Sequence, residues 1–148
     1  MKTKLNLFTK FVLDFMFFSG IGICILVPVI FKFIGRYYEN IRNFYIPMCI
    51  LFMITGAFAI LIIYELRKMF RTVIREDPFV VDNVNSLKKM GKYSFVIAAV
   101  TAIRLFFVLT PATFIIIIVF FIAGLFSFVL SQVFDQAVTY KIENDFTI

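Results

Sequence analysis

Apolar residues dominate four long stretches of the chain, at 11–33, 45–64, 93–110 and 113–134. The first two are 23 and 20 residues long, which satisfies the about 20 residues that a helix needs to cross the hydrocarbon core. The third has 18 residues, the lower end of that range, although its helix can begin earlier. The pattern predicts an all-α polytopic membrane protein with four transmembrane helices.

A polar segment, ELRKMFRTVIREDPFVVDNVNSLKKMGK at 65–92, separates the two pairs of apolar stretches. It holds seven of the fifteen Lys and Arg residues, a charge density that excludes it from hydrocarbon. Apolar residues at helical spacing extend the second helix into it, until Asp77-Pro78 stops that helix. Asp82 or Asn83 is expected to cap the next helix. We therefore expect two helical hairpins joined by a helical elbow.

The distribution of cations gives the orientation. If the chain begins inside the cell, the tails 1–10 and 135–148 and the elbow hold eleven Lys and Arg, whereas the outer loops hold three. Cytoplasmic segments of membrane proteins carry the excess of these residues. Both tails and the elbow are therefore predicted to be cytoplasmic.

The second hairpin is expected to be tight. Only a few residues around Pro111 separate its two apolar stretches. Small residues recur at four-residue spacing in both, and such faces let helices approach closely in lipid. We expect direct contact between these faces, which consist of Ser94, Ala98 and Ala102 in one helix and Ala123, Ser127 and Ser131 in the other.

Composition narrows the function. The chain is 62% hydrophobic, with 22 Phe and a mean hydropathy of +1.00, far from a soluble domain. Its net charge of +6 comes from cations that flank apolar stretches, so we expect contact with lipid headgroups and no direct binding of nucleic acid. There is no His, and Cys24 and Cys49 lie in apolar stretches. With no phosphate-binding loop and no acidic pair within one span, we expect neither an enzyme nor a metal or cofactor site.

Asp14 and Arg104 fall inside apolar stretches, and intramembrane charge is a functional hypothesis by default. Arg104 lies seven residues before Pro111, about 10 Å from the outer end, where it can reach outward toward Glu39 or the loop tyrosines. It is interpreted as structural or as part of a pore or ligand site. Asp14 lies near the opposite face. Small four-helix multidrug exporters use one acid in the first helix, but nearer to mid-membrane.

Two motifs carry a resemblance to a known family. The first is Asp77-Pro78-Phe79-Val80, with Leu66-Arg67 and Ile74 before it and Asn83, Leu87 and Gly91 after it. The second comprises Val133-Phe134 and the closing ENDFTI. In these motifs the chain resembles bacterial membrane proteins of the domain-of-unknown-function 2975 family, although Gln136-Ala137 replaces a glycine that relatives carry. The resemblance implies a four-span protein of the bacterial inner membrane without known enzyme activity. It also implies a membrane-bound partner of a small helix-turn-helix transcription regulator.

That implication fits a cytoplasmic surface made by the elbow and the tail, which is predicted to fold back on the elbow or to dock a partner. The predicted partner-binding residues are Arg71, Arg75, Asp77, Pro78, Phe79 and Asn83 in the elbow, and Glu143, Asp145 and Ile148 in the tail. The alternative is a small transporter or immunity component that binds a peptide or an anion near Arg104. Association with a second copy of the chain stays open.

Overall fold

The computed structural model describes residues 4–146, and within them the fold is entirely α-helical. The expected all-α class is therefore confirmed. The helices are α1 (Lys4–Ile34), α2 (Glu39–Asn43), α3 (Tyr45–Ile74), α4 (Val81–Arg104) and α5 (Pro111–Phe146).

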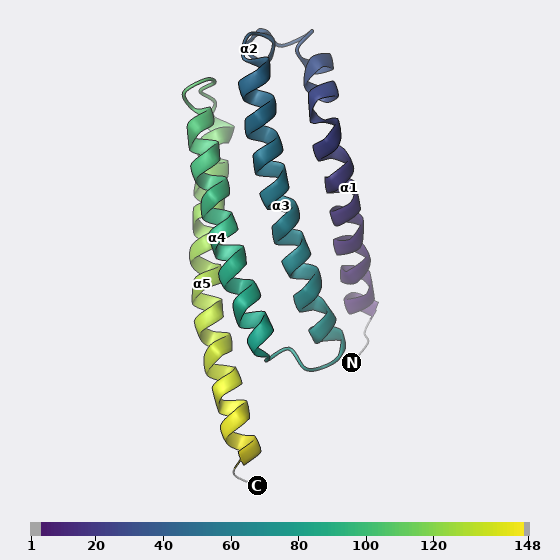
Figure 1. Ribbon diagram of the computed structural model, residues 1–148, viewed down its shortest axis with the longest axis vertical. Helices are drawn as coiled ribbons and strands as arrows, with labels where there is room; N and C mark the ends of the chain where they lie inside the picture. Colours follow the sequence, from purple (N-terminus) through teal and green to yellow (C-terminus); the bar gives the residue numbers. More distant parts are fainter. Residues whose placement is uncertain (1–3, 147–148) are drawn as a thin grey trace.

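The four long helices lie side by side in an open row (Figure 1). In the described part of the chain, α1 packs on α3, α3 on α4 and α4 on α5, whereas α1 contacts neither α4 nor α5. Because the row does not close into a bundle, the outward faces of α1, α3 and α5 keep many large apolar side chains exposed. These three helices are each long and apolar enough to cross a membrane.

Helix α4 differs from its neighbours, and in the described residues it is not among the helices with such an apolar composition. Lys88, Lys89 and Lys92 lie in its first half, and polar side chains such as Ser86 and Ser94 are buried. It lies between α3 and α5 and carries more buried residues than they do. The two serines are therefore covered by protein, whereas the three lysines are exposed.

The row has two ends (Figure 1). The start of α1, the loop 75–80 and the end of α5 lie at one end, which we call the basic end. Helix α2 and the loop 105–110 lie at the opposite end. Asn83 at the start of α4 bonds to Thr72 near the end of α3. At the other end of α4, the Arg104 guanidinium lies 4.7 Å from the ring centre of Phe52, so α4 follows α3 over most of its length.

The loop between α4 and α5 is longer than the sequence indicated. The stretch 93–110 is helical only to Arg104 and continues as a turn at 105–107 and an irregular segment at 108–110. Pro111 then opens α5, a position that suits proline because the first N–H of a helix has no partner within the helix. Proline also disfavours helical backbone at the residue before it. The prediction that only a few residues around Pro111 separate the two helices was therefore wrong, because residues 105–110 also lie outside them.

Both tails are more helical than the sequence indicated. Helix α1 already begins at Lys4, and α5 continues through the predicted tail to Phe146. No glycine or proline occurs between Phe134 and Phe146 to stop it. In Figure 1 the last turns of α5 project beyond the other helices.

Close approach of α4 and α5 depends on two glycines. A Cβ at Gly91 would lie 2.7 Å from the Phe128 ring, and one at Gly124 would lie 2.7 Å from the Phe95 ring. The rings of Phe95 and Phe128 stack at 5.6 Å between centres. Of the predicted small residues, Ser94, Ala98, Ser127 and Ser131 are buried. The predicted contact between the two helices is confirmed.

Candidate functional site

An ion pair joins α1 to α3 near the basic end. Arg67 Nε donates a hydrogen bond to Asp14 Oδ1 at 2.8 Å. The Arg67 guanidinium also lies 4.5 Å from the ring centre of Phe17 and 5.3 Å from that of Phe18, which adds cation–π attraction. The Asp14 carboxylate, considered above as an isolated charge, is therefore engaged by a fixed partner.

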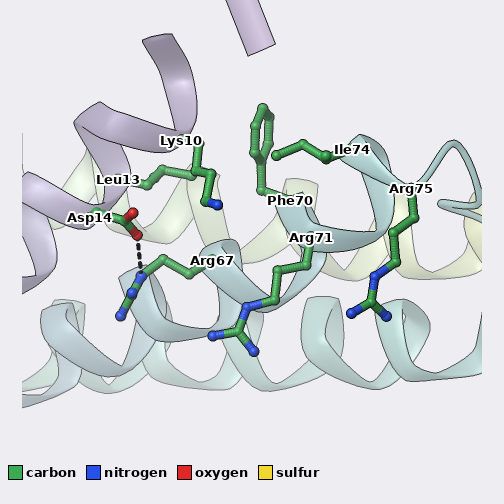
Figure 2. Close-up of a pocket in the computed structure, with 8 residues that line it drawn as sticks. All are labelled: Lys10, Leu13, Asp14, Arg67, Phe70, Arg71, Ile74 and Arg75. Atoms are coloured by element: carbon green, nitrogen blue, oxygen red, sulfur yellow. Dashed lines mark hydrogen bonds and ion pairs between the residues drawn. The ribbon is translucent and has the colours of Figure 1, made fainter. Parts of the chain in front are cut away.

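This ion pair forms one side of an open cleft of about 420 Å³ between α1 and α3. In Figure 2, Arg67 and Arg71 of α3 are followed by Arg75 directly after the helix, and Lys10 projects from α1 on the other side of the cleft. Leu13, Phe70 and Ile74 supply apolar walls. The residues therefore combine an excess of cations with apolar surface, an arrangement suited to an anion with a hydrocarbon part.

The loop 75–80 is held by the amide of Asn83. Asn83 Nδ2 donates to Thr72 Oγ1 at 2.7 Å and to the Pro78 carbonyl at 2.6 Å. Its side chain is buried. Glu76 adopts a left-handed backbone conformation, with φ 61°, which reverses the chain after α3. The two hydrogen bonds fix the turn from within the fold.

The predicted cap of α4 was wrong. Val80, in extended backbone, precedes the first helical residue, and no side chain caps the helix there. Asp82 and Asn83 both lie inside α4. Asn83 does not cap α4, because its side-chain amide donates hydrogen bonds to the loop 75–80 and to α3 instead.

The same loop is attached to the end of α5. Lys141 Nζ forms an ion pair and hydrogen bond with Asp77. The rings of Phe79 and Phe134 meet edge to face, 5.4 Å between centres. These two contacts join segments that are far apart in the sequence. Through them the loop 75–80 and the end of α5 lie next to each other and form one continuous surface.

The acidic residues of the tail take no part in that attachment. Glu143 and Asp145 are exposed, and among residues 4–146 no ion pair joins them to Arg71 or Arg75. The cation and the acid of the observed contact are the reverse of those expected, since the tail supplies the Lys and the loop supplies the Asp. Ile148 lies outside the described residues.

Arg104 is the last residue of α4 and does not lie within a longer helix as the sequence indicated. Its Nη2 donates to Thr113 Oγ1 at 2.9 Å, and Thr113 is buried. A cation at a helix C-terminus is also favoured by the helix dipole. Arg104 lines a cavity of about 430 Å³ at the opposite end, together with Tyr38, Glu39, Asn40, Ile41, Met48, Phe52, Val108, Thr110 and Thr113.

Glu65 is a buried charge that the sequence did not single out, because it continues an ordinary helical pattern. It is only 4% exposed on α3. Its Oε2 lies 3.5 Å from Lys68 Nζ and, among the described residues, accepts no hydrogen bond. Only tertiary packing distinguishes it from the neighbouring exposed charges.

The cysteines are both free. Cys49 packs in an apolar cluster with Val27, Phe31 and Met48, and Cys24 Sγ donates to the Met53 carbonyl at 3.6 Å. Among residues 4–146, no cluster of three Cys, Asp or Glu side chains is arranged to hold a metal ion.

Three apolar helices of membrane-spanning length and an apolar outer surface define an α-helical membrane protein. A family model described as "Protein of unknown function (DUF2975)" matches residues 29–148. The chain belongs to this family, and the resemblance inferred from its motifs is confirmed. The match covers α2 to α5 and begins within α1, after Asp14. The search of curated proteins and the search of solved structures found no match.

Proposed function

We propose that the protein crosses the membrane four times, with its basic end in the cytoplasm of a bacterial cell. The contacts Asn83–Thr72 and Arg104–Phe52 support a fourth crossing, because α4 follows α3 between them. If α3 crosses the bilayer, α4 crosses beside it. Its buried polar residues match the rule that polar groups in a bilayer face protein. The excess of Lys and Arg at the basic end supports the orientation.

We further propose that the protein is a non-enzymatic, membrane-bound regulator that binds a cytosolic protein. The observation that carries this proposal is the attachment of the loop 75–80 to the end of α5 through Lys141–Asp77 and Phe79–Phe134. This attachment fixes α5 to the loop, while the last turns of α5 project beyond the other helices and are accessible to a partner. Tyr140, Ile142 and Phe146 are exposed there.

The charge of this surface indicates the kind of partner. Glu143 and Asp145 are exposed among the apolar side chains at the end of α5. A DNA-binding protein, such as a small helix-turn-helix regulator, carries a basic face for phosphates. An acidic and apolar helix end complements such a face. Binding there would hold the regulator at the membrane and compete with its DNA.

The test is capture of cross-linked partners from cells by the full chain and by three variants. Deletion of residues 139–148 and the reversal Glu143→Lys are both expected to lose a DNA-binding partner identified by mass spectrometry. The matched reversal Glu39→Lys, in α2 at the opposite end, is expected to retain it. A partner captured equally by the deletion variant would overturn the proposal.

A second candidate function rests on the cavity at the opposite end. Arg104 lines it together with Tyr38, Glu39 and Thr110, so cationic, acidic and hydroxyl groups converge there. A small transporter or immunity component would bind a peptide or an anion at such a place. If Arg104→Ala abolishes the cellular phenotype while deletion of residues 139–148 changes nothing, this function replaces the regulator.

A further inference from the structure

The stripe of three arginines in the α1–α3 cleft carries an uncompensated positive charge. Arg67 and Arg71 of α3 and Arg75, the residue that follows the helix, are spaced four residues apart and all line the cleft. Like charges at this spacing repel one another on a helix. Such a stripe is stabilised when an anion lies beside it.

Asp14 neutralises only the first of these arginines. Its carboxylate is bonded to Arg67, whose guanidinium is also held against Phe17 and Phe18. Among residues 4–146, no ion pair involves Arg71, Arg75 or Lys10. Because Asp14 is already occupied, its charge opposes an incoming anion less than a free carboxylate would.

The three remaining cations come from both walls of the cleft. Arg71 in the last turn of α3 and Arg75 directly after it are exposed, and Lys10 is exposed on α1. Their donors are therefore accessible, and the planar guanidinium groups suit the oxygens of a phosphate. Lys10 adds a point charge from the other side.

We propose that this cleft binds the phosphate of an anionic phospholipid headgroup, with Arg71, Arg75 and Lys10 as its donors. Leu13, Phe70 and Ile74 form apolar walls beside these cations, which suits the glycerol and upper acyl chain of a lipid. The cleft lies where the apolar stretches of α1 and α3 give way to charged sequence. Basic pockets between helices at this level are typical sites for acidic headgroups. Free phosphate carries the same anionic group, but it has no hydrocarbon part to contact the apolar walls.

This site and the proposed regulator surface depend on different contacts. The cleft lies between α1 and the end of α3, and Arg75 is the first residue after that helix, whereas the partner surface is held by Asp77 and Phe79 farther along the loop 75–80 and by the end of α5. A variant can therefore lose lipid binding and still capture the partner, or lose partner capture and still bind lipid. Measuring both in the same variants separates the two outcomes.

The test is native mass spectrometry of the full chain in detergent, titrated with phosphatidylglycerol, with phosphatidylcholine, or with phosphatidylglycerol in the presence of millimolar inorganic phosphate. The variant Arg71→Gln/Arg75→Gln removes two cations from the cleft. The control Lys88→Gln/Lys89→Gln removes two exposed cations from the first half of α4. Each arginine removed is expected to weaken phosphatidylglycerol binding about fivefold, whereas the control retains it. Thermal unfolding midpoints identify any variant that fails to fold.

Each outcome decides the proposal. Selective loss in the arginine variant, with weak binding of phosphatidylcholine and no competition by inorganic phosphate, supports it. Equal loss in both variants shows a diffuse surface charge and overturns it, as does unchanged binding in the arginine variant. Competition by inorganic phosphate assigns the cleft to the free anion and overturns the lipid as occupant. If the arginine variant unfolds, Lys10→Gln provides the same comparison from the α1 wall.

Discussion

Asp14 on α1 and Arg67 on α3 form an ion pair, with 2.8 Å between Oδ1 and Nε, across 53 residues of sequence. It is an ion pair between two helices that are also joined by hydrogen bonds from the Tyr45 hydroxyl to the Pro28 carbonyl and from Cys24 Sγ to the Met53 carbonyl. The Arg67 side chain is 19% exposed and that of Asp14 is 37% exposed, so water screens the pair only in part. The link fixes α1 to the rest of the row and defines one side of the basic cleft.

The first prediction concerns the coupling between these two residues. Asp14→Asn, Arg67→Gln and the double variant are expected to show a coupling free energy on the order of 1 kcal/mol. The reason is that each single change leaves the other charge without its partner. Denaturant titration in micelles measures the free energies of unfolding. A cycle of Asp14→Asn with Arg71→Gln serves as the control and is expected to show a smaller coupling. Equal couplings would contradict a specific pair.

The second prediction concerns the glycines between α4 and α5. Gly91→Ala and Gly124→Ala are each expected to lower the free energy of unfolding by about 1–3 kcal/mol, because the added Cβ would overlap an aromatic ring at 2.7 Å. Gly22→Ala is the matched control, since nothing lies within 4 Å of its added Cβ. It is expected to be neutral or stabilising. Thermal unfolding in detergent distinguishes the three, and a stable Gly124→Ala protein would show that the helices lie farther apart.

The third prediction concerns the buried amide of Asn83. Asn83→Ala is expected to destabilise the fold by about 1–3 kcal/mol, because it removes the donor to Thr72 and to the Pro78 carbonyl. Asn83→Asp retains the size but replaces the donor with an acceptor, and a similar loss is expected. Asn85 is exposed on the same turn, so Asn85→Ala should change stability little. If Asn83→Ala is as stable as Asn85→Ala while partner capture is lost, Asn83 acts in binding.

The fourth prediction concerns the proposed topology. Single cysteines introduced at Asn40, Asn85 and Asp145 in a chain with Cys24 and Cys49 replaced by Ser are tested with a membrane-impermeant thiol reagent on intact cells. Four crossings with the basic end inside predict labelling at position 40 alone. Positions 85 and 145 should label only after the cells are permeabilised. Labelling of positions 40 and 145 together from outside would indicate an odd number of crossings.

The sequence predicted most of the helices because the bilayer imposes a simple requirement of length and apolarity on each span. It also predicted that the helix through Tyr64 continues into the elbow, where α3 ends at Ile74. It missed the boundary at Arg104, because LFFVL at 105–109 is as apolar as a helix interior. Hydropathy does not distinguish a helix from an apolar loop, and the proline that ends the segment acts on backbone geometry.

The candidate site was less accessible to sequence reasoning. Arg71, Arg75 and Asp77 were predicted as parts of one surface, and the structure divides them between the α1–α3 cleft and the loop attached to α5. The pairing of Asp14 with Arg67 was missed. These residues are 53 positions apart, and the sequence does not indicate that their helices are neighbours. Glu65 gave no signal for the same reason.

The sequence by itself determined the helical class, the apolar stretches, the family motifs and the excess of cations at one end, since these depend only on residue type and spacing. The tertiary structure alone decided which helices are neighbours, which charges are neutralised and where the end of α5 attaches. An ion pair or a ring contact acts over a few ångströms. Its existence therefore depends on how the helices pack in a row, and that order is a property of the folded chain.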